Sequence, residues 1–345
     1  MNYTFIHTLD DLDALAPAWN ALLAESITNA PFLRQEYLRA WWQTLGGGEW
    51  LRGELATVTA MENGELIGIA PLFLTENRDG LLALMFIGSI EISDYLDLIV
   101  RPKHLPAFVD GLFEFLIQSK RLGPGLSKPW HLLDWYNLLE ASPSLPVLQA
   151  AAERRGWSFT QERLQPTPYI PLPGNFDAYL ASIDKKQRHE IRRKMRRAAE
   201  YGQSIRWYLA MDGSTLDSEI DALLCLMEQD PAKANFLAGT MRRQMRATVH
   251  AAFKHGWLWL AFLEIDGEKV AAALNFDYNN RLWGYNSGVD RNFIELSPGW
   301  VLLAHMLQWA NEHKRGEYDF MRGNEEYKYR FGAVDRFVMR VKITP

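Results

Sequence analysis

Hydrophobic residues recur along the chain with two different periods, which predict a mixture of helices and strands. Apolar residues three and four positions apart predict helices, for example over residues 10–24 and 240–254. Alternating apolar runs on both sides of Asn63-Gly64 predict a β-hairpin over residues 54–74, because Asn-Gly favours a two-residue turn. Helical and extended segments are mixed along the whole chain. We therefore expect an α+β fold in which helices pack on mainly antiparallel sheets.

A proline-rich segment divides this pattern into two similar halves. Residues 165–175, QPTPYIPLPGN, contain four prolines in eleven residues and cannot form a helix. Ala30–Leu33 matches Ala234–Leu237 at an offset of 204, and the segments NGELIGIAPLF and DGEKVAAALNF match at an offset of 203. The nearly constant offset indicates a duplicated unit. We expect one unit at residues 1–165 and a second at residues 166–345.

Length and composition fit a cytoplasmic protein with two apolar cores. The chain has 345 residues, of which 48% are hydrophobic. Its start lacks a basic segment followed by an apolar one, and no apolar run approaches the roughly 18 residues that span a bilayer. The single cysteine, Cys225, excludes a disulfide within the chain, and the eight histidines show no paired metal-ligand spacing. We expect no metal.

Positive charge is concentrated on one predicted helix, at residues 184–201. Residues 185–197 carry eight Lys or Arg and one Glu, a net charge of +7, against −5 for the whole chain. The helical spacing places four cations near one another on one face, where they suit a phosphate or another anion: Lys185, Arg188, Arg192 and Arg196. The anion could be a nucleotide 3′-phosphate, a lipid headgroup, RNA or an acidic protein patch. The alternative is a solvated helix without a ligand.

Another helix is predicted to begin at Ser297-Pro298-Gly299-Trp300. Serine suits the N-cap and proline the first helical position. A glycine in the first turn lets a ligand approach backbone N–H groups, and the helix dipole attracts an anion. A phosphate or pyrophosphate could bind there, although Ser-Pro-Gly is also simply a good helix start. The corresponding segment of the first unit, residues 101–106, lacks the glycine, so we expect the second unit to bind a phosphorylated cofactor.

The stretch Tyr318–Gly332, YDFMRGNEEYKYRFG, joins a short apolar run to a dense cluster of charged and aromatic residues. A strand that ends at a glycine and is followed by positive and negative side chains beside aromatic rings is typical of the base of a binding site. The alternative is an amphipathic surface helix with Glu/Lys pairs three and four residues apart.

Two of these segments are similar to a known family. KKQRHEIRRKMRR and YDFMRGNEEYKYRFG resemble GNAT-like proteins named for the cellulose-biosynthesis proteins CelD and BcsL, and residues 204–343 resemble the GNAT acyltransferase fold. Proteins of this kind look like tandem GNAT units, as do the related FemABX aminoacyltransferases. The resemblance implies transfer of an acyl group, from acetyl-CoA or another acyl-CoA, to an amine or hydroxyl of a small or saccharide-type acceptor. Ser297, Pro298, Gly299 and Trp300 would then hold the pyrophosphate, although the full Q/R-x-x-G-x-G/A string is absent.

Direct acyl transfer needs a base near the acceptor, donors for the carbonyl oxygen and an acid for the leaving thiolate. The predicted fourth strand of the unit, residues 281–287, contains no Asp or Glu. As a hypothesis we assign the base to Asp319 or Glu326 and the acid to Tyr327 or Tyr329. The candidates for substrate binding are Asn286, Arg322, Glu325, Lys328, Arg188 and Arg192.

Two other functions remain open at this point. The first is a FemABX-like aminoacyltransferase that uses aminoacyl-tRNA, with the basic helix as the RNA contact. The second is a non-catalytic GNAT-fold protein that acts as a binding or scaffold component in envelope polysaccharide assembly. The sequence leaves the acceptor, the acyl group and the oligomeric state undetermined.

Overall fold

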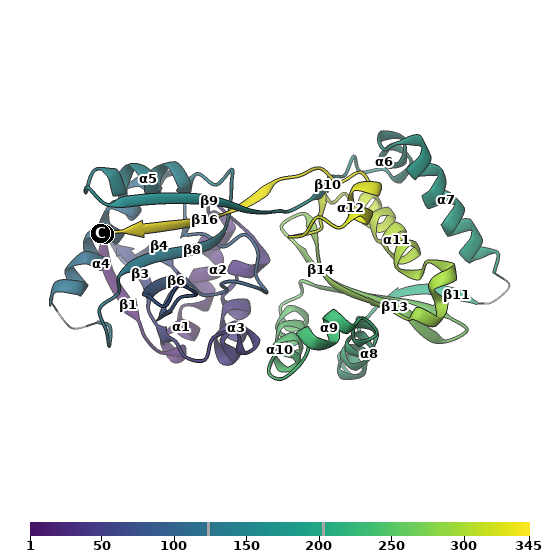
Figure 1. Cartoon of the computed structure of the whole chain (residues 1–345), viewed down its shortest axis with the longest axis horizontal. Coiled ribbons are helices and arrows are strands. Elements are labelled where there is room, and N and C mark those ends of the chain that lie inside the picture. Colours follow the sequence, from purple (N-terminus) through teal and green to yellow (C-terminus); the bar gives the residue numbers. More distant parts are fainter. Residues whose placement is uncertain (123–124, 202–203) are drawn as a thin grey trace. The chain divides into compact units, whose positions relative to one another are not determined.

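The computed structural model describes residues 1–122, 125–201 and 204–345, which form two compact units (Figure 1). The first unit contains Met1–Gln165 and Phe337–Pro345, and the second contains Pro166–Arg336. The chain thus divides at the proline-rich segment. Our expectation that the second unit extends to Pro345 is corrected by this division.

The last strand, β16 (Phe337–Thr344), joins the sheet of the first unit, where it lies between β8 (Leu132–Leu139) and β9 (Ser158–Pro166). Val338, Val341 and Ile343 are fully buried there. Arg340 also forms a bidentate ion pair with the buried Asp134, with both N–O distances at 2.8 Å. Burial of these apolar side chains and the paired charge explain why the strand returns to the first unit.

The first unit contains two mainly antiparallel sheets with strand orders β1-β3-β4-β7 and β2-β5-β6-β8-β16-β9. Its other strands are β1 (Asn2–Ile6), β2 (Glu54–Leu55), β3 (Thr57–Glu62), β4 (Glu65–Ala70), β5 (Leu72–Glu76), β6 (Leu82–Phe86) and β7 (Ile99–Val100). Its helices are α1 (Leu9–Ala14), α2 (Ala16–Ala24), η1 (Pro31–Leu33), α3 (Gln35–Gly48), η2 (Pro102–His104), α4 (Leu105–Leu122) and α5 (Ser144–Glu153).

The second unit is built on one six-stranded sheet with the order β10-β15-β14-β13-β12-β11. The strands are β10 (Tyr169–Pro171), β11 (Ile205–Leu209), β12 (Leu258–Ile265), β13 (Glu268–Tyr278), β14 (Arg281–Val289) and β15 (Glu317–Asp319). The helices are α6 (Phe176–Ser182), α7 (Lys185–Ala199), α8 (Leu216–Glu228), α9 (Pro231–Phe236), α10 (Met241–Lys254), η3 (Arg291–Leu296), α11 (Pro298–Glu312) and α12 (Glu326–Arg330).

Helices cover both faces of this second sheet (Figure 1). Helix α11 packs on β12, β13 and β14, and α6 and α7 pack against α11, whereas α8 and α10 contact the sheet from the other side. Alternate residues of β12, namely Trp259, Ala261 and Leu263, belong to the apolar core beneath α11, in which Leu302 and Leu307 are also buried. The two-residue period of the strand and the apolar stripe of the helix therefore meet in one core.

The turns confirm the predicted hairpins. Asn63-Gly64 joins β3 to β4 and Asp266-Gly267 joins β12 to β13, and all four residues have positive φ. Asn279 and Asn280, which join β13 to β14, also have positive φ. This backbone geometry matches the twist of antiparallel strands and is best tolerated by Gly, Asn and Asp. The α+β class with mainly antiparallel sheets is thus confirmed.

Gly288 lets α8 approach the sheet closely. A Cβ atom at this position would lie 2.4 Å from backbone atoms of Leu226 and Met227, which cannot move without displacing α8. We expect Gly288→Ala to lower the free energy of unfolding of the second unit by about 1–3 kcal/mol, the usual cost of overpacking. Hydrogen exchange measured by mass spectrometry on β13 and β14 checks this locally. The exposed neighbour offers a control, Ser287→Ala, which should leave protection unchanged; equal protection in both variants would contradict the packing argument.

Candidate active site

Strands β14 and β15 pair over a short distance and then separate. The parallel pairs are Arg281↔Glu317, Leu282↔Tyr318 and Trp283↔Asp319, where β15 ends. Strand β14 continues to Val289 and pairs there with β13 alone. Its register against β13 shifts at the same level, between Leu274 and Asn275. From Gly284 onward one edge of β14 therefore has no neighbouring strand within the described chain.

A buried polar network lies where the two strands part. The Tyr318 hydroxyl donates to Oδ1 of Asn275 at 3.1 Å, and Asn275 donates through Nδ2 to the carbonyl of Ala273 at 3.2 Å. A Cβ at Gly284 would lie 2.6 Å from the Tyr318 hydroxyl oxygen, so glycine is required for this close approach. Burial raises the pKa of Tyr318 well above its usual value, and Tyr327 and Asp319 add to the shift. Tyr318 thus remains a neutral donor.

Tyr327, in the first turn of α12, lies close enough to Tyr318 to contribute to the rise of its pKa. Its ring packs edge-on against Phe320, with 5.9 Å between the centroids. The residue as a whole is 40% exposed, and the protein atoms around its hydroxyl partly desolvate it. This desolvation, with the nearby charge of Glu325, raises the pKa of Tyr327. The phenol keeps its proton at neutral pH, as a tyrosine with an ordinary pKa also does, and its ring remains accessible.

Lys328 does not point toward a substrate. It is 3% exposed, and its ammonium donates to the carbonyl oxygens of Phe320, Arg322 and Gly323 at 3.0–3.2 Å and lies 2.9 Å from a carboxylate oxygen of Glu325. These contacts fasten the loop between β15 and α12. The prediction that Lys328 binds the substrate is therefore corrected, because its donors are used inside the protein.

Asp319 lacks the accessibility of a general base. It is fully buried, accepts a hydrogen bond from the backbone N–H of Met321 at 2.8 Å and forms an ion pair with Arg336. Arg336 also bonds Glu317 at 2.7 Å, and its guanidinium lies 4.2 Å from the centre of the Tyr169 ring. We conclude that Asp319 holds the end of β15 in place, which corrects its proposed role as base.

The other predicted catalytic residues lie on the surface of the same segment. Glu326 is 79% exposed and pairs with Arg330 at 2.6 Å. The Tyr329 hydroxyl donates to Asp335 at 2.8 Å, and burial together with this contact raises the pKa of Tyr329 to about 12. Glu325 is largely exposed. Of the two predicted acids, only Tyr327 contributes to the electrostatic environment of Tyr318.

The remaining substrate-binding candidates are spread over the unit. Asn286 lies on the part of β14 that pairs with β13 alone, and its side-chain oxygen accepts the N–H of Ser287 at 2.9 Å. Arg322 is partly buried in the loop before α12. On α7, Arg188 approaches the carbonyls of Leu180 and Ala181 at 3.4 Å, and Arg192 pairs with Asp177 at 3.1 Å. These two arginines contact α6, so the structure does not bring them to Tyr327.

Lys233 belongs to the site although the sequence did not indicate it. It lies on α9, and its ammonium donates to the carbonyl of Ser287 on β14. Burial lowers its pKa, against the opposing influence of Asp230 and Glu325. The carboxylate of Glu325 is therefore close enough to influence the pKa of Lys233 and the pKa of Tyr327. A single lysine in a short helix carries no sequence signal, because only the packing of α9 on β14 gives it this position.

The start of α11 offers fewer backbone donors than expected. Ser297 occupies the N-cap position but has a left-handed conformation, with φ of 53°, and its side chain makes no capping hydrogen bond. Its carbonyl accepts the N–H groups of Trp300 and Val301 at 3.0 and 3.1 Å. Pro298 has no N–H. Within this turn, the N–H of Gly299 is the group that donates to no backbone carbonyl of the described residues. Trp300 packs on Phe331, with 4.7 Å between the centroids, and under the Lys194 ammonium at 4.0 Å.

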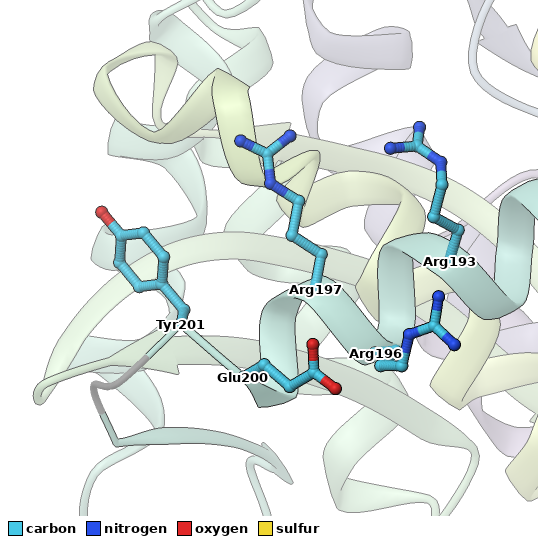
Figure 2. Close-up of a pocket in the computed structure, with 5 residues that line it drawn as sticks. All are labelled: Arg193, Arg196, Arg197, Glu200 and Tyr201. Atoms are coloured by element: carbon cyan, nitrogen blue, oxygen red, sulfur yellow. The ribbon is translucent and has the colours of Figure 1, made fainter.

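An open pocket lies at the C-terminal end of α7. Figure 2 shows the residues that line it, Arg193, Arg196, Arg197, Glu200 and Tyr201.

Two further properties concern metals and membranes. The described residues contain no group of three or more His, Cys, Asp or Glu that could hold a metal ion. Every helix of the described ranges is too short or too polar to cross a membrane.

Comparisons with known proteins identify the type of domain in the second unit and the fold of the chain. Residues 185–329 match a family model described as "Acetyltransferase (GNAT) domain". The second unit carries a GNAT-type domain. The whole chain is also similar in fold to a solved structure of FemX, with a TM-score of 0.64 and 12% identity over 99% of this chain and 97% of that one.

Two further solved structures share the two-unit fold. One is a tandem GNAT protein from the clavulanic acid biosynthesis pathway, with a TM-score of 0.52 and 14% identity over 99% of this chain and 97% of that one. The other is L-PGS from Bacillus licheniformis, with a TM-score of 0.54 and 12% identity over 99% and 93%. At these identities the similarity shows the fold, and two GNAT-like units account for the duplicated sequence pattern. A search of curated protein sequences found no match.

Proposed function

We propose that the second unit transfers an acyl group from acyl-CoA to an amine or hydroxyl of a small acceptor. The observation that carries this proposal is the separation of β14 from β15 beyond Trp283 and Asp319, with the protonated Tyr327 beside the point of separation. The match of residues 185–329 to the GNAT acetyltransferase domain supports it. The similarity of residues 185–197 and 318–332 to the CelD and BcsL proteins favours a saccharide-type acceptor.

Acyl-CoA supplies an activated thioester and a thiolate leaving group. The unpaired edge of β14 from Gly284 to Val289 offers backbone groups to an extended acyl arm. The N–H of Gly299, the positive end of the α11 dipole and the nearby Lys194 would attract the pyrophosphate. The residues therefore fit such a ligand, although one backbone N–H makes the turn a weak anion site by itself.

Each step of the transfer then has a residue in reach. Tyr327 is the general acid that gives its proton to the leaving thiolate. Glu325 replaces Asp319 as our candidate base, because it is exposed and close enough to influence Tyr327 and Lys233. The ammonium of Lys233 is suited to an anionic group of the acceptor. Asn286, on the unpaired edge, is placed to orient the acceptor.

A FemABX-like reaction with aminoacyl-tRNA is the second candidate, favoured by the cationic surface of α7. Proteins that neutralise several phosphates lose affinity steeply as salt rises, whereas a small ligand with few charges loses much less. The salt dependence of binding therefore distinguishes tRNA from acyl-CoA. Both reactions would place the protein in the cytoplasm.

The decisive experiment measures binding of acetyl-CoA to the full chain by isothermal titration calorimetry, followed by a screen of amine and hydroxyl acceptors for release of the CoA thiol. We expect a dissociation constant in the range of enzyme substrates, about 1 μM–1 mM, and thiol release that depends on an acceptor. Longer acyl-CoAs and tRNA are titrated in parallel. Absence of binding by every acyl-CoA, together with salt-sensitive tRNA binding, would replace this proposal with the second candidate.

A further inference from the structure

One face of α7 gathers arginines that the acyl-transfer site does not use. Arg193, Arg196 and Arg197 recur at helical spacing, and together with Glu200 and Tyr201, which follow the helix, they line the open pocket at its end (Figure 2). The opposite stripe, which includes Ile191 and Ala198, is buried in the core of the unit. The helix therefore anchors itself by its apolar stripe and presents the arginine face, Arg193, Arg196 and Arg197, to solvent.

The arginine face keeps a net positive charge. Arg193 pairs with Glu190 at 2.7 Å, and Arg197 approaches Glu295 at 3.8 Å. Arg196 has no acidic partner among residues 1–122, 125–201 and 204–345. Glu200 adds one negative charge to the pocket lining against three guanidinium groups. A planar guanidinium that is already ionised binds phosphate through two parallel hydrogen bonds, so this set suits a phosphate monoester.

The pocket adjoins the start of α11, where the pyrophosphate is proposed to bind. Helix α7 contacts both α11 and η3. Lys194 lies 4.0 Å over the Trp300 ring, and Arg197 faces Glu295, two residues before Ser297. Trp300 in turn packs on Phe331, directly after α12. A continuous series of contacts thus connects the helix of Tyr327, the first turn of α11 and the arginine face.

The arginine face is also compact. Arg188 and Arg192, in the first half of α7, contact α6, and the exposed Lys185 and Lys186 lie outside the pocket, so the cations that line the pocket all belong to the last turns. A single phosphate beside an aromatic ring requires a few clustered cations and an accessible ring. The three arginines supply the cations, and Tyr201 is 47% exposed. The shape favours one nucleotide with a terminal phosphate.

We propose that the arginine face binds the 3′-phosphate of the adenosine end of acyl-CoA, with the Tyr201 ring against the adenine. The inference rests on the proposed acyl-CoA function and specifies how that ligand is recognised. It also explains how a turn with one available N–H could hold the cofactor, because much of the binding free energy would come from α7. The protein would then discriminate CoA from its 3′-dephospho form.

The test is calorimetric titration of the full chain with CoA and with 3′-dephospho-CoA. We expect CoA to bind roughly 10-fold to 100-fold more tightly, since hydrogen bonds to charged groups contribute at this level. The double variant Arg193→Gln/Arg196→Gln should bind both ligands with similar dissociation constants. Both arginines are exposed, so this variant should fold.

A matched control removes the same charge elsewhere in the unit. Lys186→Gln/Arg243→Gln replaces two exposed cations outside the pocket and should keep the preference for CoA. Equal affinity of the wild-type protein for the two ligands would overturn the 3′-phosphate site while leaving acyl-CoA binding intact. If neither CoA nor 3′-dephospho-CoA binds, this site and the proposed function are both overturned. Salt-sensitive tRNA binding that disappears in the arginine variant, without a CoA preference in the wild type, would reassign the arginines to RNA.

Discussion

Replacing Tyr327 with phenylalanine is expected to lower kcat by about 100-fold to 10,000-fold, the usual contribution of a general acid. The dissociation constant of acetyl-CoA should stay nearly unchanged, because the ring and its contact with Phe320 remain. Steady-state release of the CoA thiol, with the acceptor found in the screen, measures kcat. Calorimetry measures the binding.

The pH profile gives an independent readout of the same residue. Desolvation raises the pKa of Tyr327, so the folded protein keeps the phenol protonated above pH 10, where a free tyrosine ionises. The wild-type rate should therefore show no alkaline fall through the ordinary tyrosine range. Tyr329→Phe is the matched control, since this hydroxyl bonds Asp335 and should be dispensable. Full turnover by Tyr327→Phe, or equal losses in both variants, would remove Tyr327 from the mechanism.

Replacing Arg336 with methionine should lower the stability of the second unit by about 3–5 kcal/mol, the cost of leaving a buried carboxylate without its partner. Asp319 is fully buried, and the nearby Glu317 adds a second negative charge. Hydrogen exchange of peptides from β14 and β15 follows the loss within the unit, without assuming that both units unfold together. The apo protein suffices for this measurement.

A double-mutant cycle identifies the cause of that loss. Asp319→Asn/Arg336→Met removes both charges and should recover much of the stability lost in Arg336→Met, because no fully buried carboxylate is left unpaired and Glu317 keeps Arg281 within 3.4 Å. If Asp319 were instead a base, Asp319→Asn would abolish turnover while keeping native exchange protection. If the stability effects of Asp319→Asn and Arg336→Met were simply additive, the ion pair between Asp319 and Arg336 would not hold β15 in place.

Much of the fold is encoded in short stretches of sequence. The two-residue and 3.6-residue periods, the Asn-Gly and Asp-Gly turns and the run of four prolines act within a few residues, so they indicate strands, helices, hairpins and the break between units directly. The repeat at an offset of 203–204 showed the duplication. The cationic helix and the start of α11 were also local patterns, and they lie as expected at Lys185–Ala199 and Pro298–Glu312.

The roles of individual side chains in the site depended on tertiary contacts. Lys328 and Arg322 look alike in the sequence as exposed cations, yet the ammonium of Lys328 turns inward to the loop carbonyls. Asp319 looks like an available base until Arg336, seventeen residues further along the chain, is seen to pair with it. Such pairing depends on how distant segments are packed together, which periodicity does not record.

The sequence by itself determined that this protein is an α+β chain of two related units, with a cationic helix and a Tyr-rich segment after the last predicted helix of the second unit. Only the tertiary structure decided that β16 returns to the first unit, that Lys233 reaches β14 and that Tyr327 stands where β14 and β15 part. The physical reason is that secondary structure follows from local backbone preference and the spacing of apolar residues. Burial, charge pairing and strand order follow from contacts between residues far apart in the chain.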